Sequence, residues 1–128
     1  MKLYCVMKVD ADGKPLVGSG SMMLGVRQTD PAQPNKRADV RAVSGADVVQ
    51  PGEGGMSYYS DPAAITIQLG KLVLWSIESD DLPPELIPQD AGVPHYHIEP
   101  SRAVSLDGFQ ELLADTRDLW QREQGANP

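Results

Sequence analysis

The chain has 128 residues, 11 of them basic and 18 acidic, and a formal net charge of −7. Its length fits one domain that buries roughly two-thirds of the surface exposed by its unfolded form. The acidic balance argues against broad attraction to nucleic acid or anionic lipid, so no nucleic-acid groove is expected. A single cysteine, Cys5, excludes an internal disulfide and a Cys-rich zinc site.

The pattern of apolar residues predicts no membrane insertion. Lys2 is followed by a short alternating segment and then by polar residues, unlike a signal peptide. No apolar run approaches the roughly 20 residues that span a bilayer. We therefore expect a cytoplasmic protein, or one that reaches a target-cell cytoplasm without an N-terminal signal peptide.

The N-terminal part predicts one strand, one turn and one long loop. Leu3–Val9 is mostly apolar and rich in strand-forming residues, and Asp10–Gly13 after it favours a turn. Arg27 to Asp39 is polar and contains Pro31 and Pro34, which predicts an exposed loop. Loops of this length in compact domains are usually functional or mobile.

The second half predicts two strands and two short helical turns. Asp61 followed by proline is a typical helix start that leaves room for about one turn. Lys71–Ile77 is nearly all apolar, which predicts a central strand covered on both faces. Ser79–Asp81 and the following LPPELIP predict an aspartate-capped helical turn closed by Pro88, and His95–Glu99 predicts another strand.

The C-terminal segment predicts an amphipathic helix from Leu106 to Arg122. Ser105 is a suitable N-cap, and apolar residues recur at helical spacing up to Trp120. Leu113 and Trp120 are therefore expected to pack together from one helix onto a sheet.

The stretch from 47 to 61 is where a pocket is expected. It joins several glycines, which permit positive φ and close approach of a ligand, to the hydroxyls and rings of Ser57, Tyr58 and Tyr59. The alternative is an ordinary strand start with one tyrosine packed inward.

The two histidines offer alternative chemistry. In a strand, His95 and His97 point to the same face as Glu99, so a metal-dependent hydrolase is geometrically conceivable. No further ligand is indicated, and we expect no metal. A nucleophilic Ser57 activated by a histidine is also conceivable, although the chain lacks a Gly-x-Ser-x-Gly elbow.

The order of segments resembles a known family. An N-terminal Leu-Tyr strand, GGMSYY, a WSI strand, DDLPPEL, an HYHIEP strand and a terminal helix ending near Trp120 follow one another. Together they resemble the small cytotoxic type VI secretion effectors that have an ADP-ribosyltransferase-like fold. The resemblance extends from Leu3 to about Trp120.

This resemblance implies an α+β fold with a compact split mixed β-sheet, flanking helices and one amphipathic C-terminal helix. It implies a single domain over residues 1–124 with a disordered tail at 125–128. A bacterial toxin of this kind implies a neutralising immunity protein as a partner. The oligomeric state is left open.

The resemblance also implies a cleft for NAD. Ser57 would line the cleft, and Tyr58 or Tyr59 would stack on nicotinamide. Glu99 would act with Ser57 as a catalytic residue by stabilising an oxocarbenium ion on the nicotinamide ribose. Arg27 would hold the pyrophosphate.

One position separates transfer of ADP-ribose from simple binding. Active transferases usually carry Arg or His on the first strand, where this chain has Cys5. The hypotheses are therefore a toxin that transfers ADP-ribose from NAD to an unknown target, or a catalytically inactive domain of the same fold that binds a protein or a nucleotide.

Overall fold

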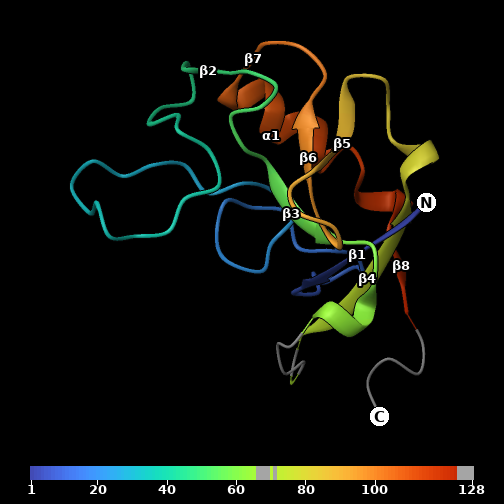
Figure 1. Ribbon diagram of the computed structural model, residues 1–128. Coiled ribbons are helices and arrows are strands. Elements are labelled where there is room, and N and C mark those ends of the chain that lie inside the picture. Colours follow the sequence, from blue (N-terminus) through green and yellow to red (C-terminus); the bar gives the residue numbers. More distant parts are fainter. Residues whose placement is uncertain (66–69, 71, 124–128) are drawn as a thin grey trace.

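The computed structural model describes residues 1–65, 70 and 72–123, which form two β-sheets, one α-helix and three 3-10 helices (Figure 1). The strands are β1 (Lys2–Met7), β2 (Val48–Val49), β3 (Met56–Tyr59), β4 (Val73–Glu78), β5 (Leu86–Asp90), β6 (His95–Pro100), β7 (Val104–Ser105) and β8 (Gln121–Arg122). The helices are α1 (Leu106–Ala114), η1 (Pro62–Ala64), η2 (Ser79–Asp81) and η3 (Arg117–Leu119).

The larger sheet has six strands in the order β5-β6-β3-β1-β4-β8, and the smaller one joins β2 to β7. The expectation of a small α+β protein is confirmed. The expected mixed sheet is wrong for the described strands, because all their pairs are antiparallel. Antiparallel neighbours such as β5 and β6 need only a short connection, whereas parallel ones need a long crossover.

The first strand and its turn form as predicted, with the strand ending at Met7 rather than Val9. Asp10 fixes the turn, since its Oδ1 accepts the backbone N–H groups of Asp12 at 2.8 Å and Lys14 at 3.0 Å. Gly13 takes a φ of +78°, which glycine adopts without steric cost.

The strand expected at Lys71–Ile77 is present as β4, with Lys71 outside the described residues. It lies between β1 and β8 and pairs with β1 from Lys2 opposite Glu78 to Met7 opposite Val73. Leu74 to Ile77 are all buried, so both faces are covered as predicted.

The short helical turns are partly confirmed. Asp61 caps η1 by accepting the N–H of Ala63 at 2.9 Å. Helical turn η2 occupies the predicted Ser79–Asp81, but no aspartate caps it, and the following LPPELIP is not helical. Its last residues form β5 instead. Pro88 is tolerated there because β5 is an edge strand.

The C-terminal helix begins as predicted and ends early. Ser105 caps α1 by accepting the N–H of Gly108 at 3.0 Å. The predicted end at Arg122 is wrong, because α1 stops at Ala114. Both the backbone N–H and the hydroxyl of Thr116 donate to the carbonyl of Leu113, at 3.1 and 2.6 Å, which turns the chain out of the helix.

Trp120 reaches the core from outside the helix. It is extended, 3% exposed, and its ring stacks on Tyr58 with a centroid distance of 5.4 Å. Its indole N–H donates to the Thr116 hydroxyl at 3.1 Å, so the polar atom is satisfied inside the core. The predicted burial of Trp120 is therefore right, although the predicted helical backbone is not.

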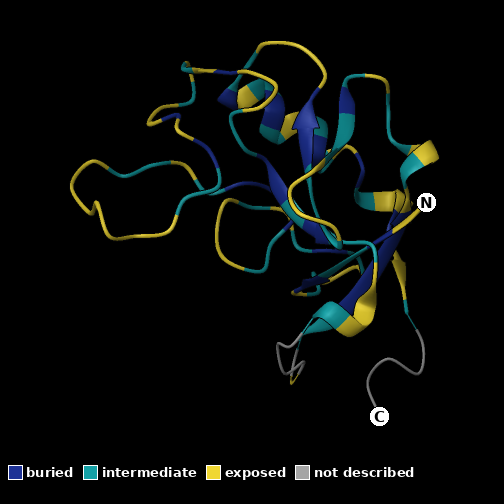
Figure 2. Cartoon of the chain, viewed as in Figure 1, coloured by how far each residue is buried: buried dark blue, intermediate teal, exposed yellow. Residues whose placement is uncertain are grey.

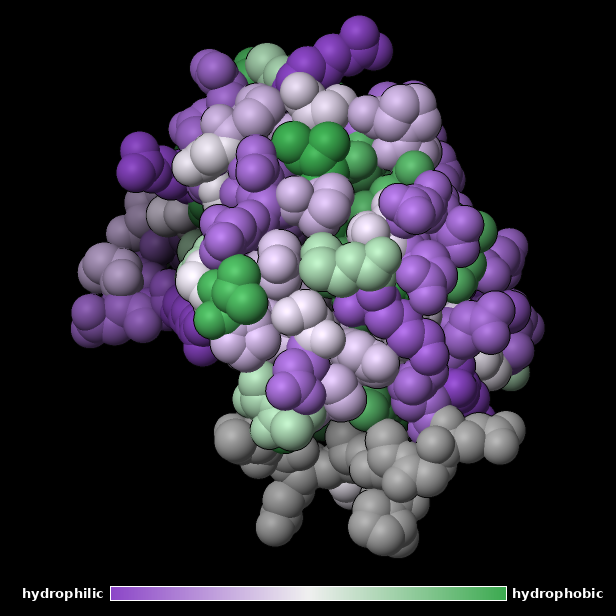
Figure 3. All heavy atoms as spheres, turned by 45° about the vertical axis from the view of Figure 1, so that its right-hand side comes forward, coloured by the Kyte–Doolittle hydropathy of each residue, from purple (hydrophilic) through white to green (hydrophobic). Residues whose placement is uncertain are grey.

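One cluster of buried side chains joins the larger sheet, α1 and the segments around them (Figure 2). The loop over residues 27–39 projects away from the sheet and is largely exposed, as predicted (Figures 1 and 2). One face of the surface is mainly hydrophilic, with separate apolar spots (Figure 3). No helix among the described residues is long and apolar enough to cross a membrane. The predicted tail at 125–128 lies outside the described part.

Candidate functional site

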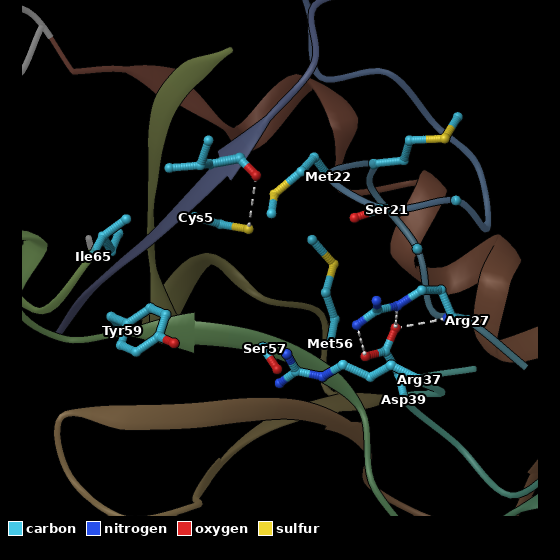
Figure 4. Close-up of a pocket in the computed structure, with 14 residues that line it drawn as sticks. Cys5, Ser21, Met22, Arg27, Arg37, Asp39, Met56, Ser57, Tyr59 and Ile65 are labelled. Carbon is cyan, nitrogen blue, oxygen red and sulfur yellow. Dashed lines mark hydrogen bonds and ion pairs between the residues drawn. The ribbon is translucent and has the colours of Figure 1, made fainter. Parts of the chain in front are cut away.

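A pocket of about 220 Å³ lies between β1 and β3. These strands pair only at Tyr4 opposite Tyr59, so the sheet opens beyond that point. The lining side chains come from both strands, from the segments 20–25 and 27–39, and from the end of η1 (Figure 4). They belong to Cys5, Val6, Ser21, Met22, Met23, Arg27, Arg37, Asp39, Met56, Ser57, Tyr59 and Ile65, together with Gly20 and Gly25.

The glycines before β3 serve the fold at close backbone contacts. A Cβ on Gly54 would collide with the carbonyl oxygen of Asp39, and one on Gly55 would collide with that of Ile98. Gly54 also has a φ of +109°. Neither glycine lines the pocket. Their lack of a side chain lets the 27–39 loop and β6 come close to β3, whereas the sequence predicted that it would let a ligand come close.

Arg27 and Asp39 close the neck of the 27–39 loop. The Arg27 guanidinium donates from Nε to Oδ2 at 3.1 Å and from Nη2 to Oδ1 at 2.9 Å, and its backbone N–H donates to Oδ2 at 2.7 Å. The bond to Asp39 raises the pKa of Arg27. This bidentate pair joins the two ends of the 27–39 loop, and we call it the clamp.

Arg37 enters the pocket from the same loop, two positions before the clamp. Its side chain extends toward Ser57 (Figure 4). Its charge also contributes to the lowered pKa of His95, after burial and the charge of His97. Among the described residues that line the pocket, the positive group outside the Arg27–Asp39 pair is therefore that of Arg37.

Ser57 and Tyr59 line the pocket, whereas Tyr58 does not. Alternate residues of a strand face opposite sides of the sheet. Tyr58 is 0% exposed and stacks on Trp120. The ring available for stacking on a ligand is that of Tyr59, which itself stacks on His95 at a centroid distance of 5.1 Å.

Glu99 lies outside the pocket and holds a turn. It is 4% exposed, and its Oε1 accepts the N–H of Gly52 at 2.7 Å. Its Oε2 lies 3.6 Å from Nδ1 of His97. The carboxylate therefore fastens the Pro51-Gly52 turn to β6, and the structure does not bring it together with Arg27 around one pocket.

The histidines share a face, as predicted from their spacing. Their rings lie edge to face at a centroid distance of 5.0 Å, and His97 pairs across the sheet with Ser57. No hydrogen bond joins Ser57 to His97 among the described residues, which activation of the hydroxyl would require. Within the same residues, no group of His, Cys, Asp and Glu is arranged to hold a metal ion.

Sulfur-containing side chains form another wall of the pocket. Burial, followed by the charge of Asp39, raises the pKa of Cys5 to about 12, so its thiol stays neutral near pH 7. Met22 has a φ of +58°, a left-handed conformation that is uncommon outside glycine. Its carbonyl accepts the N–H of Lys8 at 2.8 Å, which ties the strained residue to the end of β1.

Searches of protein-family models, curated proteins and solved structures each returned no match to this chain.

Proposed function

We propose that the chain binds NAD, or a related nucleotide, in the pocket between β1 and β3. The observation that supports this proposal is that the Tyr59 ring, the Ser57 hydroxyl and the Arg37 guanidinium line one pocket. A flat ring suits stacking on a base, while a guanidinium and a hydroxyl suit a phosphate or a ribose. Pockets with a few converging polar groups are the usual sites of small ligands.

The size of the pocket favours one end of the ligand. Its volume of about 220 Å³ is below the roughly 300–1,000 Å³ typical of sites that enclose a drug-sized molecule. One ring and its ribose would enter, and the rest of a dinucleotide would lie along the projecting loop.

The arrangement of acidic residues favours binding over transfer of ADP-ribose. Stabilising an oxocarbenium ion needs a carboxylate beside the ribose. Glu99 is directed at the Gly52 turn, and the carboxylate that lines the pocket, Asp39, is paired with Arg27. Cys5, neutral near pH 7, supplies no cation for NAD. We therefore propose a nucleotide-binding domain first and a transferase second.

Calorimetric titration with NAD tests the proposal, with Ser57→Ala and Tyr59→Leu as pocket variants and Ser101→Ala as an exposed control. Loss of one hydrogen bond weakens binding about 3- to 10-fold, so Ser57→Ala should raise the Kd by that factor. Tyr59→Leu should weaken binding further by removing the stacking surface. Absence of heat and of any NAD-induced rise in Tm at about 5 mM would overturn the proposal.

The resemblance to secretion effectors adds the proposal that the protein is toxic inside bacteria. Growth of a culture that produces the native chain tests it, beside folded and equally abundant Ser57→Ala and Ser101→Ala variants. Arrest by the native chain and Ser101→Ala, relieved by Ser57→Ala, would support a toxin acting through the pocket. Unaffected growth at high soluble expression would contradict it.

A further inference from the structure

The charges around the pocket do not balance. Arg27 and Asp39 neutralise each other through two charge-assisted bonds. Glu99 is held by the Gly52 N–H and faces His97. Arg37 takes part in no ion pair among residues 1–65, 70 and 72–123. A chain of net charge −7 therefore presents an unpaired guanidinium at the pocket.

Two hydrogen-bonding groups on the paired strands β3 and β6 also lack partners. Within the described part of the chain, Nε2 of His95 is buried and makes no hydrogen bond. Ser57 faces the pocket, and its hydroxyl takes part in none of the side-chain hydrogen bonds that the described residues form. Buried polar groups are normally hydrogen-bonded, so the nitrogen of His95 is an unsatisfied group beside the ring of Tyr59, which lines the pocket.

The fold holds these groups near one another. Ser57 and Tyr59 project from the same face of β3, and their cross-strand partners on β6 are His97 and His95. The clamp at Asp39 fixes the end of the loop that carries Arg37, whose guanidinium extends toward Ser57 (Figure 4). A rigid strand thus presents one donor, and an anchored loop presents the cation.

We propose that Arg37 and Ser57, which both line the pocket, bind the phosphate of a nucleotide at its mouth. The inference rests on the proposed function for the identity of the ligand, and it moves the anion-binding role from Arg27 to Arg37. A guanidinium suits this group because its planar donors match two phosphate oxygens. The base or nicotinamide then lies against Tyr59.

The test is a titration of the native protein, Arg37→Ala and Arg41→Ala with AMP, adenosine and inorganic phosphate. Arg41 is an exposed arginine that does not line the pocket, so Arg41→Ala removes the same charge as Arg37→Ala without changing the pocket. Loss of a charge-assisted bond costs roughly a factor of 10 to 100, so Arg37→Ala should weaken AMP binding by that amount. Arg41→Ala should change it less than about twofold, an effect of general charge alone.

The outcomes separate this inference from the proposed function. AMP that binds at least about tenfold more tightly than adenosine, with the difference abolished in Arg37→Ala, supports the subsite even if NAD does not bind. NAD and AMP that bind equally to the native protein and Arg37→Ala would overturn the subsite and leave the proposed function standing. Equal dependence of inorganic phosphate and AMP on Arg37 would show a phosphate site without nucleotide recognition, which overturns the nucleotide assignment.

Discussion

Replacing Arg27, one half of the clamp, with alanine should destabilise the protein and loosen the loop that carries Arg37. The side chains of Arg27 and Asp39 are 27% and 14% exposed. Arg27→Ala removes two charge-assisted bonds and leaves a mostly buried carboxylate with one backbone donor. Such losses cost about 2–3 kcal/mol, which corresponds to roughly 6–12 °C in Tm for a domain of this size.

A double-mutant cycle in urea measures this effect. Arg27→Ala, Asp39→Ala and the double variant should give a coupling energy of about 1–2 kcal/mol, because the second substitution removes a group that the first left unpaired. Tryptic cleavage after Arg37 should accelerate in all three variants. Additive effects on the free energy of unfolding, with unchanged cleavage, would refute the clamp.

Four further predictions concern single groups. Tyr58→Phe should leave the free energy of unfolding unchanged or raise it by up to about 1 kcal/mol, because its buried hydroxyl has no partner among the described residues; a larger loss would contradict this. Glu99→Ala should lower that energy by about 1.5–3 kcal/mol and Glu99→Gln by less, as measured in urea, whereas equal losses would argue against a charge-assisted bond. Burial and nearby positive charge lower the pKa of His95 below 6.5, so just below that pH the unfolded chain binds more protons than the folded one, and stability should fall as the pH falls. His95→Gln should make the urea midpoint depend less on pH in this range, and an unchanged pH dependence would refute this. Because its pKa is about 12, Cys5 should react with a disulfide reagent at pH 8 at least about 100-fold more slowly in the folded protein than in urea, and equal rates would contradict its desolvation.

Local features of the fold could be predicted because their causes are local. The strand at β1, the turn at Asp10 and the caps at Asp61 and Ser105 depend on neighbours in sequence. The strand at β4 was indicated by a continuous apolar run. In each case the residue types and the structure they favour lie within a few positions of one another.

The errors arise where distant residues decide the backbone. Helical spacing up to Trp120 was correct as a burial pattern, but stacking on Tyr58, which is distant in the sequence, favours an extended end. The segment LPPELIP was predicted to form a helical turn, yet pairing with β6 makes its last residues, from Leu86, part of an edge strand. Register across a sheet cannot be derived from the spacing within one segment.

The candidate site was predicted in part for the same reason. Whether Tyr58 or Tyr59 faces a pocket stayed open, because it depends on how β3 packs against distant residues such as Trp120. The clamp between Arg27 and Asp39 spans a long loop, and no local pattern reveals it. The sequence therefore indicated the strand that carries Ser57. The resemblance implied Arg27 as the anion-binding residue, whereas we propose Arg37 for that role.

Titration of NAD into isotope-labelled protein, followed by amide and guanidinium NMR signals, tests the central claim most directly. Saturable shifts should concentrate on Ser57, Tyr59 and the side chain of Arg37, with little change at Tyr58 or at the exposed Arg41. Shifts that are absent, or that lie away from the opening between β1 and β3, would contradict the claim that this pocket binds a nucleotide.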